Sequence, residues 1–319
     1  MDREQFLERR KQGIGGSDIA AIIGLSPWST PRDIYLDKKG LAEPEPETDA
    51  MYWGTTLEDI VAREYSKRTG RKIERCNVLF RHPEYPFLLG NIDRAVYDED
   101  SKRPVVNGEY RSKRGLECKT ASQYAASDWG EAGTDQIPEY YKAQVQWYMG
   151  ITGADVWDVA VLIGNRDFRI YTVNRDEAVI SYLFGEGVGF WREYIEKDIM
   201  PPARTLEDIE NVFSGTPKAR AFASMEITEK VERYKELDDQ IKALKAEQEP
   251  LKVAICDHIG DAVELVAPDA RKLASWSAAK PTSKTDWKAV AEELAAPADI
   301  VAKHTTETMS ARRFTVSAK

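Results

Sequence analysis

The sequence has few of the residues that build thiol or imidazole metal sites. Of its 319 residues, three are cysteine and three are histidine. Cys76, Cys118 and Cys256 are far apart and odd in number, which argues against a disulfide framework, a four-cysteine zinc site and a cysteine-held iron–sulfur cluster. The histidines form no His-Glu-x-x-His pattern, which argues against a zinc hydrolase. A serine or cysteine nucleophile would lack an evident base.

Long apolar runs are also absent. No stretch approaches the ~18 consecutive apolar residues that a membrane span needs. The N-terminus has no basic region followed by an apolar segment, so we expect no signal peptide. With 42% hydrophobic and 31% charged residues, the composition is typical of a soluble globular protein. We therefore expect a cytoplasmic protein.

Positive charge is in deficit, since the formal net charge is -9. By itself this points away from nucleic acid. Local basic clusters at 9–11 and 102–114 nevertheless offer candidate contacts, and a site that gathers carboxylates around a metal also makes a chain acidic. Net charge thus leaves the question open.

The hydrophobic pattern predicts an α/β (α+β) core in which a central mixed sheet is flanked by helices. Helices are expected at 3–11, 18–23, 31–39, 50–69, 138–149 and 176–197. Strands are expected at 71–80, 86–97, 115–120, 156–163 and 168–173.

The C-terminal third has a different character. Apolar residues spaced three and four apart over 226–256 predict a coiled-coil-like helix or helical hairpin, with Pro250 marking a break or kink. The rest reads as a small α+β module with strands at 262–266, 272–277 and 312–316 and a helix at 287–294. The predicted division is 1–204, 205–258 and 259–319.

The most informative residues are Asp93, Glu117 and Lys119. Residues two apart in a strand share a face, so Glu117 and Lys119 emerge together. If a neighbouring strand brings Asp93 beside them, two carboxylates can bind a hard divalent cation such as Mg²⁺. The adjacent ammonium can orient a water and stabilise charge on a phosphate. This pattern indicates metal-assisted phosphodiester hydrolysis, although an isolated Glu-x-Lys is more often an ordinary surface pair.

Four companions strengthen this interpretation. Glu58 on the 50–69 helix can add a carboxylate, and Gln144 on the 138–149 helix can hold a water or phosphate oxygen. The glycine-rich turn before Ser17 exposes backbone N–H groups to an anion, and Arg10 adds a guanidinium. Taken singly, Glu58 is better explained as a solvated helical residue and Gln144 as part of a polar helix face. For Arg10 and Ser17 the alternative is a capped helix after a flexible turn.

Tryptophans offer a further kind of contact, because unpaired bases stack on aromatic rings. Most of them are expected in the core. Trp28 and Trp129 lie in loop-like surroundings near the candidate residues and are the ones worth testing.

Together these motifs resemble the YqaJ-like viral recombinases, phage exonucleases similar to lambda exonuclease within the PD-(D/E)xK nuclease superfamily. The resemblance covers residues 1 to about 200, and the segment at 13–28, GIGGSDIAAIIGLSPW, is especially similar. One departure is Ile92 before Asp93, where the superfamily motif has proline. The matching motifs are Arg10…Ser17, Trp53-Gly54-x-x-x-Glu58, Asp93, Glu117-Cys118-Lys119 and Gln144-Val145-Gln146.

The resemblance implies a restriction-endonuclease-like core and an enzyme that digests one strand of linear duplex DNA from its 5′ end, leaving 3′ overhangs. Asp93 and Glu117 would ligate one Mg²⁺, with the Cys118 carbonyl completing the shell, and Glu58 would hold or position a second ion. Mn²⁺ is expected to substitute.

The same resemblance assigns the remaining residues and the partners. Lys119 would assist the attacking water, Gln144 would contact the water or phosphate, and Arg10 and Ser17 would hold the 5′-phosphate. It further implies a phage or prophage gene expressed in a bacterial host, a ring-shaped homotrimer and a single-strand annealing protein as partner.

Two rivals remain open. A restriction- or junction-type endonuclease of the same superfamily would use the same metal residues without an end-recognition pocket. A non-catalytic DNA-binding protein would keep the fold, although such a protein would be expected to have lost at least one of the motif residues.

Overall fold

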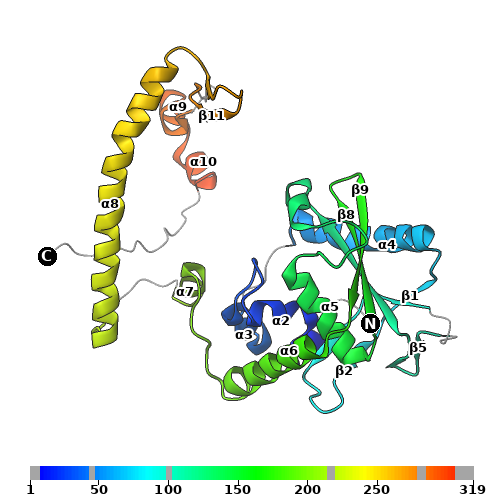
Figure 1. The fold of residues 1–319 in the computed structure, drawn as a ribbon. Coiled ribbons are helices and arrows are strands. Elements are labelled where there is room, and N and C mark those ends of the chain that lie inside the picture. The colour runs from blue at the N-terminus through cyan, green and yellow to red at the C-terminus, as the bar shows by residue number, and fades with distance from the viewer. Residues whose placement is uncertain (1–7, 43–46, 98–102, 214–219, 279–284, 306–319) are drawn as a thin grey trace. The chain divides into compact units, whose positions relative to one another are not determined.

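The computed structural model describes residues 8–42, 47–97, 103–213, 220–278 and 285–305 (Figure 1). The chain forms two compact units, Met1–Val212 and Phe213–Lys319. The predicted boundaries at 204/205 and 258/259 remain a prediction. Within the first unit, α7 (Leu206–Val212) is tied to α3 (Pro31–Lys39), because Thr30 Oγ1 donates to Asp208 Oδ1 at 2.6 Å.

A five-stranded mixed sheet forms the centre of the first unit (Figure 1). Strands β7 and β8 are parallel, and α5 (Glu139–Thr152) makes the crossover between them; the other neighbours are antiparallel. In spatial order the strands are β1 (Ile73–Arg75), β4 (Arg94–Val96), β7 (Arg114–Ala121), β8 (Val156–Ile163) and β9 (Asp167–Asn174).

Alternation along β7 decides what each face of the sheet carries. Leu116 and Cys118 point to α4 (Asp49–Thr69) and join its buried cluster. Glu117 and Lys119 point the other way, toward α5, where α2 (Gly16–Ile22) and α6 (Glu177–Phe190) complete the covering layer. The strand therefore presents its acidic and basic side chains between a sheet and a helix rather than to open solvent.

The N-terminal segment is joined by backbone hydrogen bonds to the hairpin of β2 (Leu79–Arg81) and β3 (Leu89–Asn91). The Ile14 N–H donates to the Phe87 carbonyl at 2.7 Å, and the Leu89 N–H donates to the Ile14 carbonyl at 2.7 Å. A Cβ at Gly13 would lie 2.1 Å from the Phe87 oxygen, so only glycine allows this approach. The first unit also holds β5 (Val105–Val106), β6 (Glu109–Tyr110), the 3₁₀ helix η1 (Gln123–Asp128) and the π-helix η2 (Trp191–Ile195).

The predicted mixed α/β architecture, a central sheet flanked by helices, is confirmed. Strands expected as single segments at 71–80 and 86–97 are each divided, because β1 pairs with β4 in the main sheet whereas β2 pairs with β3 in a separate hairpin. The helix expected at 176–197 ends in a π-helical turn. Of the helix expected at 3–11, residues 3–7 lie outside the described structure.

In the second unit, α8 (Met225–Ile259) is one helix that continues through Pro250. The predicted single helix is therefore present, and the alternative of a hairpin with a break at Pro250 is wrong, whereas a kink there stays a prediction. Proline lacks one backbone N–H donor, and the hydrogen bonds of the neighbouring turns keep the segment helical on both sides of it. Leu237, Ile241, Leu244 and Leu251 are exposed on α8, and their coiled-coil pairing stays a prediction. The expected strand at 312–316 lies outside the described residues. A small module follows: β10 (Glu264–Val266), β11 (Lys272–Ser275), α9 (Trp287–Glu293) and α10 (Ala298–Lys303).

Candidate active site

A hydrogen-bonded group of three side chains lies between β7 and α5. Lys119 Nζ donates to Glu117 Oε1 at 2.6 Å and to Gln144 Oε1 at 3.1 Å. Gln144 Nε2 donates to the same Glu117 oxygen at 2.9 Å and to the Tyr148 hydroxyl at 2.9 Å. The strand and helix predicted from sequence therefore bring Glu117, Lys119 and Gln144 together.

Asp93, just before β4, joins this group through the β7 backbone. Its Oδ2 accepts from the Cys118 N–H at 3.0 Å, so the two carboxylates of Asp93 and Glu117 come from adjacent strands. Burial raises the pKa of Asp93 well above its ordinary value, and the charges of Glu117 and Glu58 raise it further. The predicted pairing of the two acids is thus present.

Glu117 is almost completely buried, and its Oε2 is a buried oxygen that has no hydrogen-bond partner among the residues that the structure describes. Burial raises the pKa of Glu117, while the neighbouring Lys119 ammonium acts against that rise. Glu117 Oε1 accepts hydrogen bonds, but a buried carboxylate oxygen that accepts none, such as Oε2, costs folding free energy because it has lost its hydration. Glu117 Oε2 is therefore positioned for a ligand that carries positive charge.

Glu58 lies on α4 and is engaged by a residue that the sequence interpretation missed. Arg94 is buried on β4; its Nη1 donates to Glu58 Oε1 at 2.6 Å and to the Asp93 carbonyl at 2.7 Å, and its Nη2 contacts Asp59. The sequence did contain a signal for this pair, because Arg94 directly precedes the apolar residues Ala95 and Val96 of a predicted strand, and a buried arginine needs a carboxylate partner. Arg94 thus fixes Glu58 beside the other two acids.

The N-terminal residues form the predicted pair. Arg10 Nη2 donates to Ser17 Oγ at 3.0 Å. Two residues that the sequence interpretation missed complete the cluster: Asp18 is buried and forms ion pairs with Lys38 at 2.7 Å and Arg10 at 3.5 Å. Burial alone would raise the pKa of Asp18, but the Lys38 and Arg10 charges lower it overall. Lys38 also forms an ion pair with Asp37 at 3.2 Å, so the two cations of the cluster meet two carboxylates, and Arg10 is the cation with the more exposed side chain.

One cavity of about 220 Å³ connects this cluster with the acidic residues. Gly16 permits the close approach of α2 to α5, because a Cβ there would lie 2.5 Å from the Tyr148 ring. Tertiary structure thereby joins two motifs about a hundred residues apart in sequence. The lining residues are Arg10, Gly15, Gly16, Ser17, Asp18, Leu79, Leu89, Asn91, Asp93, Glu117, Gln144 and Tyr148.

The two candidate stacking tryptophans differ in exposure. Trp129 is 4% exposed and packs against Tyr141 and Tyr171, so its ring is a core element and not a stacking surface. Trp28 is 69% exposed and contacts Tyr140 on α5.

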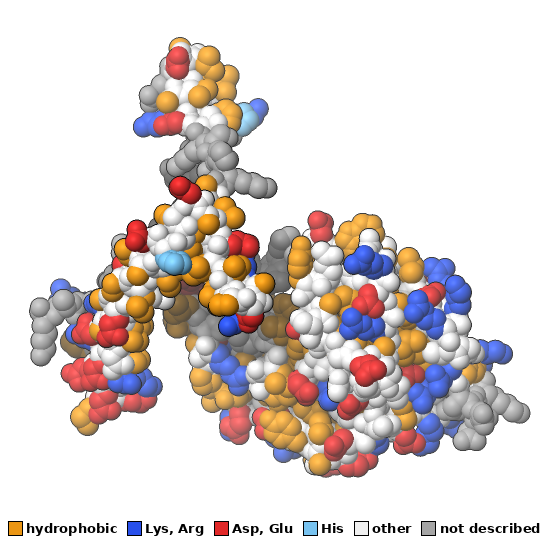
Figure 2. Space-filling model, turned by 45° about the horizontal axis from the view of Figure 1, so that its top comes forward, with side chains coloured by type: hydrophobic (Ala, Val, Ile, Leu, Met, Phe, Trp, Pro, Cys, Tyr) orange, Lys and Arg blue, Asp and Glu red, His pale blue; other side chains and the backbone are white. Residues whose placement is uncertain are grey.

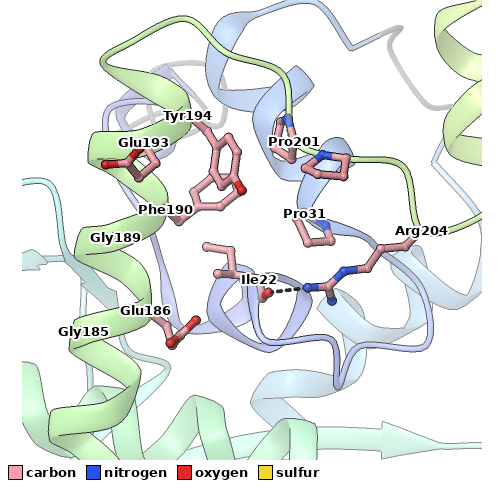
Figure 3. Close-up of a pocket in the computed structure, with 11 residues that line it drawn as sticks. Ile22, Pro31, Gly185, Glu186, Gly189, Phe190, Glu193, Tyr194, Pro201 and Arg204 are labelled. Atoms are coloured by element: carbon pink, nitrogen blue, oxygen red, sulfur yellow. Dashed lines mark hydrogen bonds between the residues drawn. The ribbon is translucent and has the colours of Figure 1, made fainter. Parts of the chain in front are cut away.

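A second cavity of about 330 Å³ lies between α2, α6 and the segment around Pro201 (Figure 3). Arg204 reaches into it and donates to the Ile22 carbonyl at 3.4 Å, while Glu186 and Glu193 lie along the α6 side. None of the residues predicted for the active site lines it. We therefore place the candidate chemistry in the smaller cavity.

Basic side chains gather along one edge of the first unit in the face that Figure 2 shows, in spite of the net negative charge. Among the described residues, no group of three or more His, Cys, Asp or Glu side chains has the arrangement of a metal site. In the same residues, no helix combines the length and hydrophobicity of a membrane span.

Comparison with known proteins gives a family and several structural likenesses. The model of the YqaJ-like viral recombinase domain matches residues 5–155, a span that contains every predicted site residue. The protein YqaJ of Bacillus subtilis (strain 168) is 33% identical over 270 residues, which cover 82% of this chain and 80% of that protein.

Two solved structures share a similar arrangement. An alkaline exonuclease from Laribacter hongkongensis is 18% identical with a TM-score of 0.48, covering 61% of this chain and 94% of its own. A phage-related exonuclease from Haemophilus somnus 129PT is 15% identical with a TM-score of 0.42, covering 58% of this chain and 96% of its own.

Proposed function

Because the chain belongs to the YqaJ family, we propose that it is a metal-dependent exodeoxyribonuclease that digests linear duplex DNA from 5′ ends. The observation that carries the proposal is the single cavity shared by the Arg10–Ser17 cluster and the Asp93–Glu117 pair. An anion site beside paired carboxylates suits a substrate strand whose terminal phosphate is held while the next phosphodiester is cut.

The residues present fit a divalent cation. The donors are carboxylate oxygens, which favour hard ions such as Mg²⁺, with Mn²⁺ as a substitute. Glu117 Oε2 is buried and has no partner in the described part of the chain, and a cation would relieve the repulsion between the charges that raise the pKa of Asp93. Asp93, Glu117 and the Cys118 carbonyl would hold the first ion. When bound, it supplies Lewis-acid activation of a water and charge stabilisation at the phosphate.

Glu58 fits the second position less directly. Its Oε1 accepts from Arg94 at 2.6 Å, so one oxygen of the carboxylate is already held by a buried arginine, which also contacts Asp59. We assign Glu58 to positioning a second ion through its remaining oxygen, with Arg94 fixing the side chain.

Lys119 acts as a donor and as a positive charge. Burial acts to lower its pKa, but the charges of Glu117 and Asp93 outweigh burial and raise it. An ammonium with a raised pKa stays protonated at neutral pH and is a poor proton acceptor. Lys119 therefore orients a water by donating to it and stabilises negative charge on the phosphate, while Gln144 fixes the Lys119 and Glu117 side chains by hydrogen bonds.

Arg10 and Ser17 would bind the 5′-phosphate, at the start of α2. The Arg10 guanidinium already donates to the exposed Ser17 hydroxyl, so both donors converge on one place. Asp18 and Lys38 set the charge and position of Arg10. Removal of Arg10 should weaken the preference for phosphorylated ends.

The deciding experiment compares 5′-phosphorylated linear duplex, 5′-hydroxyl linear duplex and a closed circle, each with Mg²⁺ or EDTA. Wild type, Lys119→Ala, Arg10→Ala and the surface control Lys67→Ala, whose lysine side chain is 80% exposed, are tested. We expect loss of linear DNA only, dependent on metal and Lys119, and loss of 5′-phosphate preference in Arg10→Ala alone. Cutting of the circle would instead indicate an endonuclease, and binding without cutting a non-catalytic protein.

The partners follow from the same family assignment. We propose that the 3′ overhangs feed recombination by a single-strand annealing protein, encoded with this gene on a phage or prophage in the cytoplasm of a bacterial host. A homotrimer is the proposed assembly, and analytical ultracentrifugation of the full chain tests it: a monomeric sedimentation coefficient would contradict the ring.

A further inference from the structure

Three aromatic rings lie together at the start of α5. The Trp28 ring centroid is 4.9 Å from that of Tyr140 at an interplanar angle of 78°, and 6.5 Å from that of Tyr141. The Tyr140 and Tyr141 centroids are 4.4 Å apart. The three rings form an aromatic cluster that belongs to a loop and a helix far apart in the sequence.

This cluster is continuous with the candidate active site. Lys119 Nζ lies 4.6 Å from the Tyr141 ring centroid while donating to Gln144, one helical turn further along α5. Positions 141, 144 and 148 lie on one face of a helix. That face passes from Tyr148 in the cavity, past Lys119, to the aromatic cluster outside it.

Trp28 is more exposed than the other described tryptophans near the site. It is 69% exposed, whereas Trp53 on α4 is 53%, Trp129 4% and Trp147 0% exposed. Aromatic side chains stabilise folding mainly through the area they bury. Single exposed aromatics are common and need no explanation. Trp28 differs because its ring lies beside the Tyr141 ring, which in turn contacts Lys119 of the candidate site.

We propose that Trp28, supported by Tyr140 and Tyr141, is a stacking platform for an unpaired nucleobase of the strand being cut. The inference rests on the proposed nuclease function. The 5′-phosphate cluster lies on the Tyr148 side of Lys119 and the aromatic cluster on the Tyr141 side. The base that meets Trp28 is accordingly on the 3′ side of the scissile phosphate, where the strand leaves its complement.

The test measures binding and does not need cleavage. Full-length protein in Ca²⁺ is titrated into duplex DNA with a 5′-phosphate and a fluorescent label at the far end, followed by anisotropy. Each of the first four nucleotides from the 5′ end is replaced in turn by an abasic analogue. Wild type is compared with Trp28→Ala, Trp28→Phe and Tyr182→Ala, an exposed aromatic on α6 that serves as control.

We expect Trp28→Ala to weaken binding about tenfold, within the range for stacking of one base, whereas Trp28→Phe and Tyr182→Ala stay near wild type. An abasic analogue at the second or third nucleotide should weaken wild-type binding similarly and leave Trp28→Ala unchanged. Unaltered binding by Trp28→Ala, or an equal loss at every abasic position, would overturn the platform.

The outcome is separable from that of the proposed function. Wild type that shows this abasic pattern but does not cut DNA in Mg²⁺ would refute the nuclease and leave the platform standing. Wild type that cuts DNA while Trp28→Ala binds normally would refute the platform alone. Absence of any DNA binding by wild type would refute both.

Discussion

Replacement of Arg94 by methionine tests a buried charge beside the candidate metal ligands. The Arg94 side chain is 4% exposed and contacts Glu58, which is 25% exposed, and Asp59, which is 61% exposed. Removing one member of a buried ion pair costs about 3–5 kcal/mol. Glu58 is partly hydrated and Asp59 largely so, which reduces the expected loss in unfolding free energy to about 2–3 kcal/mol.

Arg75→Met is the matched control. Arg75 opposes Arg94 in the β1–β4 register and reaches the same Asp59, at 3.9 Å, but the Arg75 side chain is 59% exposed. An exposed pair of this kind contributes about 0–1 kcal/mol. The two variants thus remove the same functional group from adjacent strands and differ in burial.

The assay is urea unfolding in EDTA, followed by tryptophan fluorescence and far-UV circular dichroism, with slopes compared to confirm an unchanged denatured state. Addition of Mg²⁺ should recover part of the Arg94→Met loss, because a cation between the acids replaces some of the missing positive charge. If Arg94→Met costs no more than Arg75→Met, or if Mg²⁺ stabilises neither protein, the assigned role of Arg94 is refuted.

Three further predictions follow from the site. Gly16→Ala places a methyl group 2.5 Å from the Tyr148 ring, so it should lower the unfolding free energy by about 1–3 kcal/mol, measured by urea unfolding, and abolish DNA cleavage. The control is Gly185→Ala, whose Cβ would meet no described atom within 4 Å and which should leave stability unchanged or raise it. The pKa of Asp18 is lowered in the folded protein, so its contribution to the unfolding free energy is complete above the ordinary Asp pKa and is lost as pH falls through the folded-state pKa. Asp18→Asn should therefore be less stable than wild type at neutral pH and lose less further stability below about pH 4. If wild type and Asp18→Asn lose the same stability on acidification in pH-dependent unfolding, this prediction is contradicted. Lys119→Met should reduce the cleavage rate by at least about 10²-fold without loss of fold, and a variant as active as wild type would exclude Lys119 from the chemistry.

The sequence was sufficient to identify the main elements and most of the site. Residue alternation put Glu117 and Lys119 on one face, and the helix at 138–149 brought Gln144 over them, because both periods are properties of the local backbone. The glycine-rich turn and Arg10 were predicted to serve one anion site, and the Arg10 side chain does lie within hydrogen-bond distance of Ser17. Where local geometry governs, prediction succeeded.

Prediction from sequence failed where a charged side chain pairs with a residue far away in the chain. No residue near Arg94 in the sequence indicates that Glu58 is its partner, and Asp18 contacts Lys38 only because α2 and α3 pack together. Trp129 resembles Trp28 in its loop surroundings, yet it is buried against Tyr171 while Trp28 stays exposed. Long-range packing sets the burial of each of these side chains, and burial cannot be read from neighbouring residues.

By itself, then, the sequence determined an α/β protein of the YqaJ family with an acidic pair and a lysine on adjacent strands. Tertiary structure alone decided that the N-terminal cluster and the acids share one cavity. The Ile14–Leu89 backbone bonds and the tight contact at Gly16 bring the two motifs together. The physical reason is that a short segment's own hydrogen bonds fix its conformation, whereas its position depends on which distant surface it buries.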